Sequence, residues 1–351
     1  MNLPDCERLL IVKPSSLGDV VHTLPAVSAI LRTAPHVAVD WLVNTEWAPL
    51  LGGLADRVNV IPFPRRELRG PLGLLRAKRW ADRELRTHGY DAVIDFQGLL
   101  RSALLGRLAR PRTMLGFAQA REGAALLYHE TLDLPDWKQR HAVHRNLALA
   151  AATGADISEV AFPLPVGDPV PELQEPSAPP LLLHPFSRGI GKSLAPGEVA
   201  ELCEALAPHP IWLVGSAPTA PEPAISCPGH VVDLRGKTSL TQLIGLIRHA
   251  AWTLSVDSGP MHLAAALSSK VLSIHTWSNP AMVGPWDPRA YVWRESYLGP
   301  VGELARDQFP ERRDQRRAWA LRDRLLSPAE ITRIADFLNS QLSVAAAPTS
   351  P

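Results

Sequence analysis

Residues 9–31 read LLIVKPSSLGDVVHTLPAVSAIL, and this stretch decides the fold. Its first five residues are typical of a buried strand, and the apolar spacing of its last residues predicts a helix. The loop between them, PSSLGD, contains two hydroxyls, one glycine and Asp19. Strand, polar loop and helix in this order form ligand sites at the carboxyl ends of parallel strands. The stretch therefore predicts an α/β fold with a binding loop after its first strand.

The same alternation of strand and helix patterns continues along the chain, which implies parallel sheets with crossover helices. Further strands are expected at residues 37–43, 57–61, 92–96, 181–184, 211–214, 231–234, 252–256 and 271–275. The pattern stops at the proline-rich stretch FPLPVGDPVPELQEPSAPP, residues 162–180, which is typical of a linker. We therefore expect two α/β domains with a cleft between them.

We expect an N-terminal domain and a C-terminal domain, a final helix that packs back on the N-terminal domain, and a disordered tail. The residue ranges are 1–165 for the first domain, 166–180 for the linker, 181–325 for the second domain, 326–342 for the helix and 343–351 for the tail.

Composition narrows the protein class. A length of 351 residues suits two domains, and 46% hydrophobic with 20% charged residues is ordinary for a globular protein. A net charge of +1 gives no indication of nucleic-acid binding. The three cysteines are scattered, and no apolar stretch reaches the roughly 18 residues of a membrane span. We expect a cytoplasmic protein that can still touch a membrane surface.

The first loop allows two interpretations of Asp19. The carboxylate can cap the helix that follows, or it can act as a general base on a substrate hydroxyl. Ser15 and Ser16 can cap the loop or contact a ligand, and Gly18 permits a tight turn or a close approach of a ligand. Lys13 is either a cation in the cleft or a solvated residue at the strand end.

A second carboxylate, Asp95 in the stretch IDFQG, also ends a predicted strand. It is the rival of Asp19 for a role on the acceptor side, where it could orient a hydroxyl. The chain contains no G-x-G-x-x-G and no Walker A loop, so a nicotinamide oxidoreductase is disfavoured.

The second half contains three comparable loops. In SVDSGPMHL, Asp257, Ser258 and Gly259 follow a buried strand and precede a helix, a geometry that favours phosphate, and His262 lies one turn into that helix. Each of these residues could also be explained by capping or packing. Together they favour nucleotide binding.

The other two loops are LLLHPFSRGIGKSLAP and DLRGKTSL. Ser187, Arg188 and Lys192 in the first combine a hydroxyl and two cations, which suit a diphosphate. In the second, Thr238 or Ser239 caps a helix, and the backbone there could line a nucleobase pocket.

The motifs LLIVKPSSLGDVVHTLPA, DAVIDFQGLLRSA, GKTSL and SVDSGPMHLAAAL resemble those of the lipopolysaccharide heptosyltransferases, glycosyltransferase family 9, and within them the heptosyltransferase I group. The resemblance implies a GT-B fold, with two Rossmann-like domains facing across a cleft. It also implies inverting, metal-independent transfer of L-glycero-D-manno-heptose from ADP-heptose to the Kdo of Kdo2-lipid A, without a cofactor. The implied setting is the cytoplasmic face of the inner membrane, where we expect a peripheral enzyme that is monomeric and binds no nucleic acid.

Residue by residue, the resemblance implies that Asp19 is the catalytic base. The implied donor-site residues are Ser187, Arg188, Lys192, Thr238, Asp257, Ser258, Gly259 and His262. The implied or expected acceptor-side residues are Ser15, Ser16, Gly18, Asp95, Arg121 and His141. Two departures concern the donor loops: the lysine loop continues as KSLAP rather than into a tryptophan–proline pair, and Glu222, in a proline-rich stretch, is a weak candidate for holding the ribose.

The stretch FPRRELRGPLGLLRAKRWADRELR, residues 63–86, interleaves cations with apolar residues. It contains Arg65, Arg66, Arg69, Arg76, Lys78 and Arg79, with Leu72, Leu74, Leu75 and Trp80 between them. Such a pattern suits an anionic membrane surface, and it equally suits a solvated amphipathic helix. Two further functions remain open: another nucleotide-sugar transferase of the same fold with a different donor or acceptor, and a non-catalytic nucleotide-sugar-binding protein in which Asp19 only caps.

Overall fold

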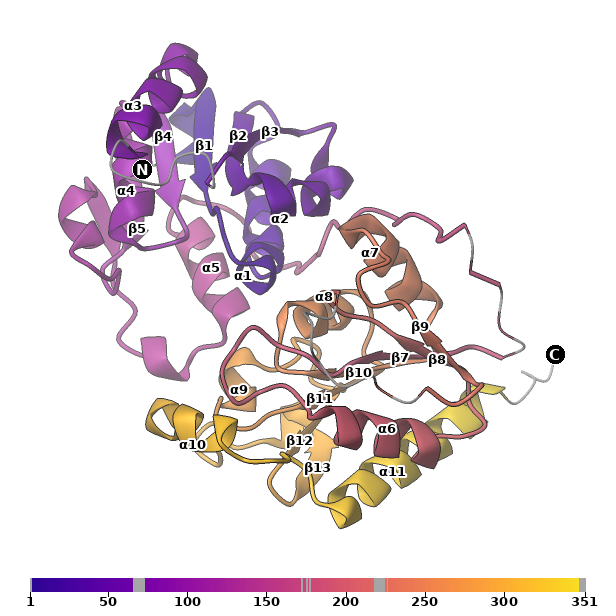
Figure 1. Cartoon of the computed structure of the whole chain (residues 1–351). Helices are drawn as coiled ribbons and strands as arrows, with labels where there is room; N and C mark the ends of the chain where they lie inside the picture. The colour runs from indigo at the N-terminus through magenta and orange to yellow at the C-terminus, as the bar shows by residue number, and fades with distance from the viewer. Residues whose placement is uncertain are drawn as a thin grey trace. The chain divides into compact units, whose positions relative to one another are not determined.

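A computed structural model describes residues 2–65, 73–171, 173–174, 176, 178–217, 225 and 227–346. The chain divides into two compact units, Met1–Pro165 and Val166–Pro351 (Figure 1). The division falls at the predicted end of the first domain.

The first unit is built on a six-stranded sheet in the order β3-β2-β1-β4-β5-β6, in which every strand pair is parallel. The strands are β1 (Arg8–Val12), β2 (Ala38–Asn44), β3 (Val58–Phe63), β4 (Ala92–Asp95), β5 (Thr113–Phe117) and β6 (Glu130–Leu132). Val12 pairs with Leu42 on one side and with Asp95 on the other, so the loops that follow β1 and β4 begin side by side.

Helices follow the strands of the first unit. They are α1 (Leu17–Val21), α2 (Leu24–Thr33), α3 (Gly73–Glu84), α4 (Leu100–Leu108) and α5 (Ala142–Ala151), with a long 3-10 segment η2 (Thr45–Leu54) and a short one η3 (Arg86–His88). Leu9, Leu10, Ile11 and Val12 of β1 are all buried, as the continuous apolar run predicted. Burying β1 on both faces fixes the point where its polar loop begins.

The second unit is built on a seven-stranded sheet in the order β13-β12-β11-β10-β7-β8-β9. The strands are β7 (Leu181–His184), β8 (Ile211–Leu213), β9 (Val231–Asp233), β10 (Trp252–Val256), β11 (Val271–Ile274), β12 (Tyr291–Arg294) and β13 (Tyr297–Pro300). Only β12 and β13 pair antiparallel among these strands. The carboxyl ends of β7, β10 and β11 are therefore neighbours.

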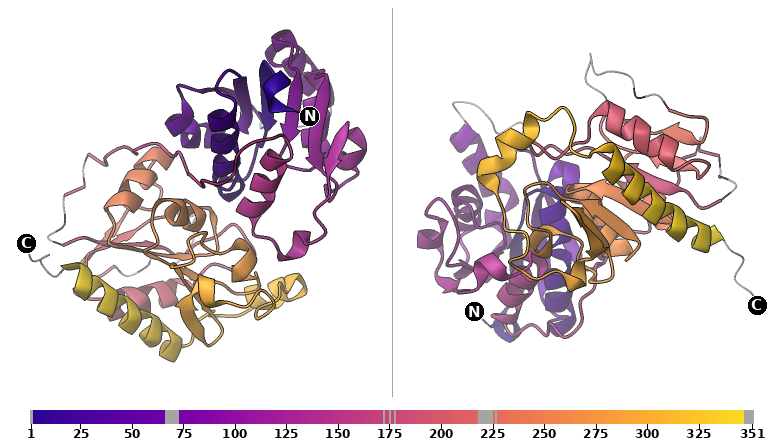
Figure 2. Two further views of the ribbon diagram at one scale, coloured as in Figure 1. Left: turned by 180° about the vertical axis from the view of Figure 1, so that it is seen from behind. Right: turned by 90° about the horizontal axis from the view of Figure 1, so that it is seen from below.

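The helices of the second unit are α6 (Pro196–Ala205), α7 (Leu240–His249), α8 (Gly259–Leu267), α9 (Pro280–Val283), α10 (Arg316–Ala320) and α11 (Pro328–Ala346). The α11 helix contacts α6 in the second unit, whose ribbon Figure 2 shows from two further sides, and Ile334 and Leu338 of α11 belong to the same buried cluster as Leu202 of α6. Buried Glu198 of α6 accepts the backbone N–H groups of Leu325 and Leu326 at 2.7 and 2.5 Å, just before α11 begins.

These contacts correct the prediction for the final helix. In the structure α11 packs on α6 and belongs to the second unit, and the helix continues to Ala346 rather than ending at residue 342. The physical reason is that its apolar residues complete the core under β7, β10 and β11, which α6 alone does not cover. Most of the predicted tail, residues 347–351, lies outside the described residues.

Where the chain passes from the first unit to the second, it is held by contacts on both sides. A Cβ on Gly53 would lie 2.3 Å from the Pro163 carbonyl oxygen, so the end of the first unit packs closely on η2. The Asp168 N–H donates to the Thr241 carbonyl at 3.0 Å, and Thr241 Oγ1 donates to the Asp168 carboxylate at 2.5 Å, both at α7. Val166, between these anchors, is 82% exposed. The predicted linker 166–180 thus begins as a segment fixed to α7.

The described helices include none that is long and apolar enough to cross a membrane.

Candidate active site: the strand-end loops of the two units

The first loop places Asp19 at the third position of α1. The Ser16 N–H and hydroxyl both donate to Asp19 Oδ2, at 2.8 and 2.9 Å. This is a capping arrangement, so the interpretation of Asp19 as a helix cap is confirmed. The Asp19 side chain is nevertheless 47% exposed. Capping uses one oxygen and leaves the carboxylate accessible to a substrate.

The second oxygen of Asp19 faces a buried cation. Lys13 follows β1 directly, its side chain is 8% exposed, and its Nζ lies 4.0 Å from Asp19 Oδ1. The same Nζ donates to the Phe96 carbonyl at the end of β4, at 2.9 Å. Lys13 is therefore buried at the base of the loop and is not a solvated flank.

The rest of the loop is fixed through its backbone. The Ser15 N–H donates to Gln97 Oε1 at 3.2 Å, which links the loops after β1 and β4. Gly18 is buried within α1, and its carbonyl accepts the His22 N–H at 2.9 Å. The structure thus brings Ser15, Ser16, Gly18 and Asp19 together, as the sequence predicted.

The structure gives Asp95 a different role from the acceptor-side role that the sequence suggested. It is fully buried, and its carboxylate accepts four hydrogen bonds, from the N–H groups of Gln97 and Gly98 at 2.8 and 3.2 Å, from Ser102 Oγ at 2.7 Å and from Tyr128 Oη at 2.8 Å. Burial raises the pKa of Asp95, and the four donors oppose that rise. With both oxygens occupied by the protein, Asp95 holds the β4 loop in place rather than presenting a free carboxylate to an acceptor hydroxyl.

The remaining acceptor-side residues lie near this loop cluster. The Arg121 N–H donates to the Gly98 carbonyl at 2.9 Å, and the exposed Arg121 is among the charges that act on Lys13. His141 caps α5, and its ring lies 5.4 Å from the ring of His22 in an edge-on contact. Arg121 therefore adjoins the loop after β4, and His141 adjoins the end of α1.

In the second unit, Lys192 and Asp257 form an ion pair that is largely shielded from solvent. Lys192 Nζ lies 2.5 Å from Asp257 Oδ2, and the two side chains are 14% and 5% exposed. The ammonium also lies 4.4 Å from the centroid of the Trp277 ring, a cation–π geometry. Ser278 Oγ donates to the same carboxylate oxygen at 2.5 Å. The predicted donor residues Lys192 and Asp257 thus meet, joined by two residues from the end of β11.

The charges of this cluster are set by burial and by neighbours. Burial alone would raise the pKa of Asp257, but His275, Lys192 and His262 lower it to about 2. Burial lowers the pKa of His275 to about 4, so its imidazole is neutral near pH 7 and bonds Ser273 and Ser278 through its two nitrogens. The cluster contains one ionised carboxylate against one ammonium.

The loop that holds Lys192 is fixed to its neighbours. Ser187 Oγ donates to the Asp257 carbonyl at 3.3 Å and accepts the Gly189 N–H at 3.1 Å. The Trp277 indole N–H donates to the Ile190 carbonyl at 2.9 Å. Arg188 lies exposed on this loop. Ser187, Arg188 and Lys192 are therefore held in one loop after β7, and their hydroxyl and two cations suit a diphosphate.

The other predicted donor residues follow the same edge of the sheet. Ser258 is the N-cap residue of α8, whose first residue is Gly259, and its hydroxyl lies 3.2 Å from His184 Nδ1 at the end of β7. His262 lies within the first turn of α8 and acts on the charge of Asp257. For the loop after β9, Ser239 rather than Thr238 caps α7. Glu222, the weak ribose candidate, lies outside the described residues.

Four site residues were missed from the sequence: His184, His275, Trp277 and Ser278. For the last three of these residues the signal was present, because HTWS begins with His275, the last residue of the predicted strand 271–275, and continues into the strand end where ligand loops are expected. The missed residues supply the aromatic face over Lys192 and the second donor to Asp257.

The basic stretch 63–86 folds in part as the helix α3. Trp80 is 7% exposed and packs edge-on against Phe63 at 5.1 Å, so it belongs to the core. Leu75 is 46% exposed, and the exposed cations of the helix include Lys78, which pairs with Asp82 at 2.8 Å. Arg66, Arg69 and Leu72 lie outside the described residues.

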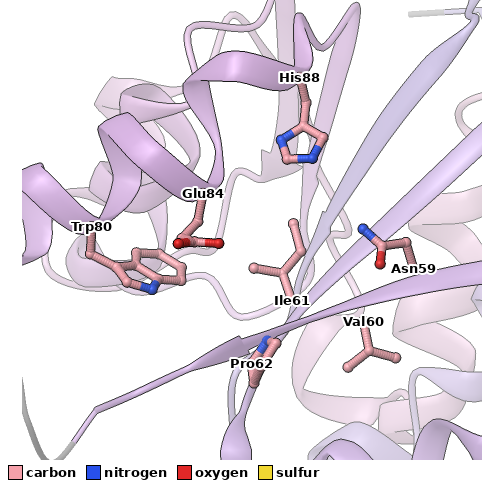
Figure 3. A pocket seen from close by; sticks show the side chains of 7 residues that line it. All are labelled: Asn59, Val60, Ile61, Pro62, Trp80, Glu84 and His88. Atoms are coloured by element: carbon pink, nitrogen blue, oxygen red, sulfur yellow. The ribbon is translucent and has the colours of Figure 1, made fainter.

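A separate cavity of about 360 Å³ lies between α3 and β3 (Figure 3). Trp80, Glu84 and His88 line it from the helix side, and Asn59–Pro62 line it from the strand. No residue predicted for catalysis or donor binding lines this cavity. Among the described residues, no group of three or more His, Cys, Asp or Glu side chains is arranged to hold a metal ion.

Comparison with known proteins agrees with this geometry. Residues 79–303 match glycosyltransferase family 9 (heptosyltransferase). Lipopolysaccharide heptosyltransferase 1 of Pseudomonas aeruginosa is 32% identical over 83% of this chain and 83% of its own length, and that of Escherichia coli K12 is 32% identical over 82% and 93%.

Solved structures are similar over the same range. E. coli heptosyltransferase WaaC with ADP matches with a TM-score of 0.68 and 27% identity, covering 86% of this chain and 97% of that one. E. coli ADP-heptose lps heptosyltransferase II matches in fold, with a TM-score of 0.67 and 21% identity over 97% and 100% of the two chains. The predicted α/β, GT-B fold with two Rossmann-like units is thereby confirmed. The chain is an enzyme of glycosyltransferase family 9, the heptosyltransferase family.

Proposed function

We propose that the protein transfers L-glycero-D-manno-heptose from ADP-heptose to the Kdo of the lipopolysaccharide inner core, Kdo2-lipid A, with inversion and without a metal. The observation that carries the donor half is the cluster of Ser187, Lys192, Asp257 and Trp277 at the ends of β7, β10 and β11. Relatives named lipopolysaccharide heptosyltransferase 1, and a related structure titled with ADP-2-deoxy-2-fluoro heptose at 26% identity, support this donor.

The reaction we propose is a single displacement. The acceptor hydroxyl oxygen attacks the anomeric carbon of the heptose, the bond from that carbon to the phosphate oxygen breaks, and ADP leaves with the bonding electrons. The hydroxyl proton goes to Asp19 Oδ1, because Oδ2 is already held by Ser16. One displacement at carbon inverts its configuration.

The reaction also requires that the negative charge on the departing diphosphate be stabilised. Lys192 carries an ammonium in the same loop as Ser187, and the backbone N–H groups at the start of α8 add partial positive charge. In this structure Lys192 is paired with Asp257, so donor binding must share the ammonium between the carboxylate and the phosphates.

The acceptor is a lipid, and we further propose that the enzyme meets it at an anionic membrane surface on the cytoplasmic side. Support comes from α3, where Lys78, Arg79 and Arg83 are exposed beside Leu75. Such a helix is attracted by anionic lipid headgroups. Trp80 is excluded from this role because it is buried.

The test is ADP release by purified protein given ADP-heptose and Kdo2-lipid A, for wild type and Asp19→Asn. We expect release by the wild type and a loss of at least about 100-fold in Asp19→Asn, because general-base catalysis contributes on that order. Equal release by both would remove Asp19 as the base. Release with another ADP-sugar but none with ADP-heptose would favour a different transferase of the same fold.

A further inference from the structure

Lys13 is a lysine whose side chain is buried, which is unusual for a charged residue. Among the described lysines it is the only one whose side chain is buried, at 6% exposure of the residue. It directly follows β1, and its N–H donates to the Leu42 carbonyl at 3.2 Å, so its backbone continues the pairing of β1 with β2. The ammonium is therefore held at a fixed point under the first loop.

The ammonium connects two strand ends. Nζ donates to the Phe96 carbonyl after β4 at 2.9 Å and lies 4.0 Å from Asp19 Oδ1. Asp19 is thus held from two directions: Ser16 binds Oδ2 through two hydrogen bonds, and Lys13 attracts Oδ1. These contacts fix the rotation of the carboxylate about its last bond.

The fold itself gains little from this charge. Burial lowers the pKa of Lys13, Asp19 and Asp95 oppose that change, and Arg121 adds to it. Asp95 already accepts four hydrogen bonds, so it does not need the ammonium as a partner. An apolar side chain of the same length would avoid the cost of burying a charge.

We propose that Lys13 is a positioning residue that orients Asp19 for proton transfer and ties the β1 loop to the β4 loop. The proposal rests on the proposed function of Asp19 as the base. Lys13 touches neither donor nor acceptor in this role. It acts through Oδ1, the oxygen that receives the proton.

The test compares Lys13→Met, Lys13→Arg and Lys13→Ala with the wild type in the ADP-release assay with ADP-heptose and Kdo2-lipid A. Methionine keeps the length and removes the charge. We expect kcat of Lys13→Met to fall about 10–100-fold, because misplacing a catalytic group by about 1 Å costs on that order. We expect KM for ADP-heptose to stay within about twofold and the thermal midpoint to stay equal or rise. Lys13→Arg, or Lys13→Ala with added methylammonium, should recover part of kcat.

Two results would overturn the proposal. The first is a kcat of Lys13→Met within about twofold of wild type. The second is a loss of kcat accompanied by a lower thermal midpoint and no recovery with arginine or methylammonium, which would make the role structural. Lys270→Met is the matched control, since Lys270 is exposed at the opposite end of β11 and should leave kcat unchanged. Asp19→Asn separates the two hypotheses: if it is as active as wild type, the proposed function fails, whatever Lys13 does.

Discussion

Substituting Lys192 by methionine and Asp257 by asparagine, singly and together, tests the ion pair at the centre of the donor site. The two charged groups are 2.5 Å apart and mostly buried. Removing one partner leaves the other as an uncompensated buried charge, which typically costs about 3–5 kcal/mol. The pKa of Asp257 falls from 3.8 to about 2 through His275, Lys192 and His262 together, against the effect of burial, and this net fall corresponds to about 2 kcal/mol of stability. We expect each single substitution to lower the free energy of unfolding by about 2–4 kcal/mol.

The contribution of Asp257 to the free energy of unfolding depends on pH in a definite direction. Since the folded-state pKa of Asp257 is depressed, its contribution is complete above the ordinary value of 3.8 and is lost as pH falls toward about 2. The stability difference between wild type and Asp257→Asn should therefore be constant from about pH 7 to about pH 5 and shrink below about pH 4.

Wild type, the two single variants and the double variant are unfolded in urea without nucleotide, which gives the coupling energy between Lys192 and Asp257. Calorimetric titration of the same four proteins gives their affinity for ADP. The double variant should lose less stability than the sum of the single variants, by at least about 1 kcal/mol, because neither charge is then left alone. It should not recover ADP affinity, which we expect to fall about 10–100-fold wherever Lys192 is absent. Additive stability losses would refute the ion-pair reasoning. Unchanged ADP affinity in Lys192→Met would refute the diphosphate role.

Three further variants, two single and one double, test other parts of the molecule. Glu198→Gln should lower unfolding stability by about 2 kcal/mol in thermal or urea melts, because Oε1 accepts the N–H groups of Leu325 and Leu326, Oε2 accepts that of Ala195, and an amide offers only one accepting oxygen; no loss would disprove that anchor. Gly116→Ala should cost about 1–3 kcal/mol, since its Cβ would lie 2.2 Å from the Tyr128 ring that supports Asp95; a wild-type melting curve would contradict the packing. Arg79→Gln with Arg83→Gln should weaken sedimentation with anionic vesicles, each charge contributing about 1 kcal/mol, and leave binding to neutral vesicles unchanged; equal loss on both vesicle types would argue against electrostatic docking.

The sequence predicted the strands that apolar runs define. For β7 and β10 the predicted and observed residues coincide, and the first strand differs by one residue at each end. Four short strands were missed. Gly116 interrupts the apolar run of β5, β6 has only one large apolar residue, and β12 and β13 form a hairpin turned by Glu295 at a positive φ of 56°. Short strands of this kind are specified by pairing partners, which local patterns do not show.

The candidate site was predictable where a strand end and a loop glycine coincide. Asp19, Lys192 and Asp257 follow that rule, and the structure gives each one a charged neighbour. Trp277 and Lys13 were missed or left open because their roles depend on which strands are adjacent. The sequence did not show which core the apolar face of α11 completes, because that depends on tertiary contacts with α6 and with the strands of the second unit.

The connection between the two units at Val166 leaves the chain little conformational freedom. The chain is fixed to η2 up to Pro165 and to α7 from Gly167, where a Cβ would lie 2.3 Å from the Gly245 nitrogen. The covalent connection between the two units therefore has few free backbone torsions, those around Val166, whereas a flexible linker of about a dozen residues would have many.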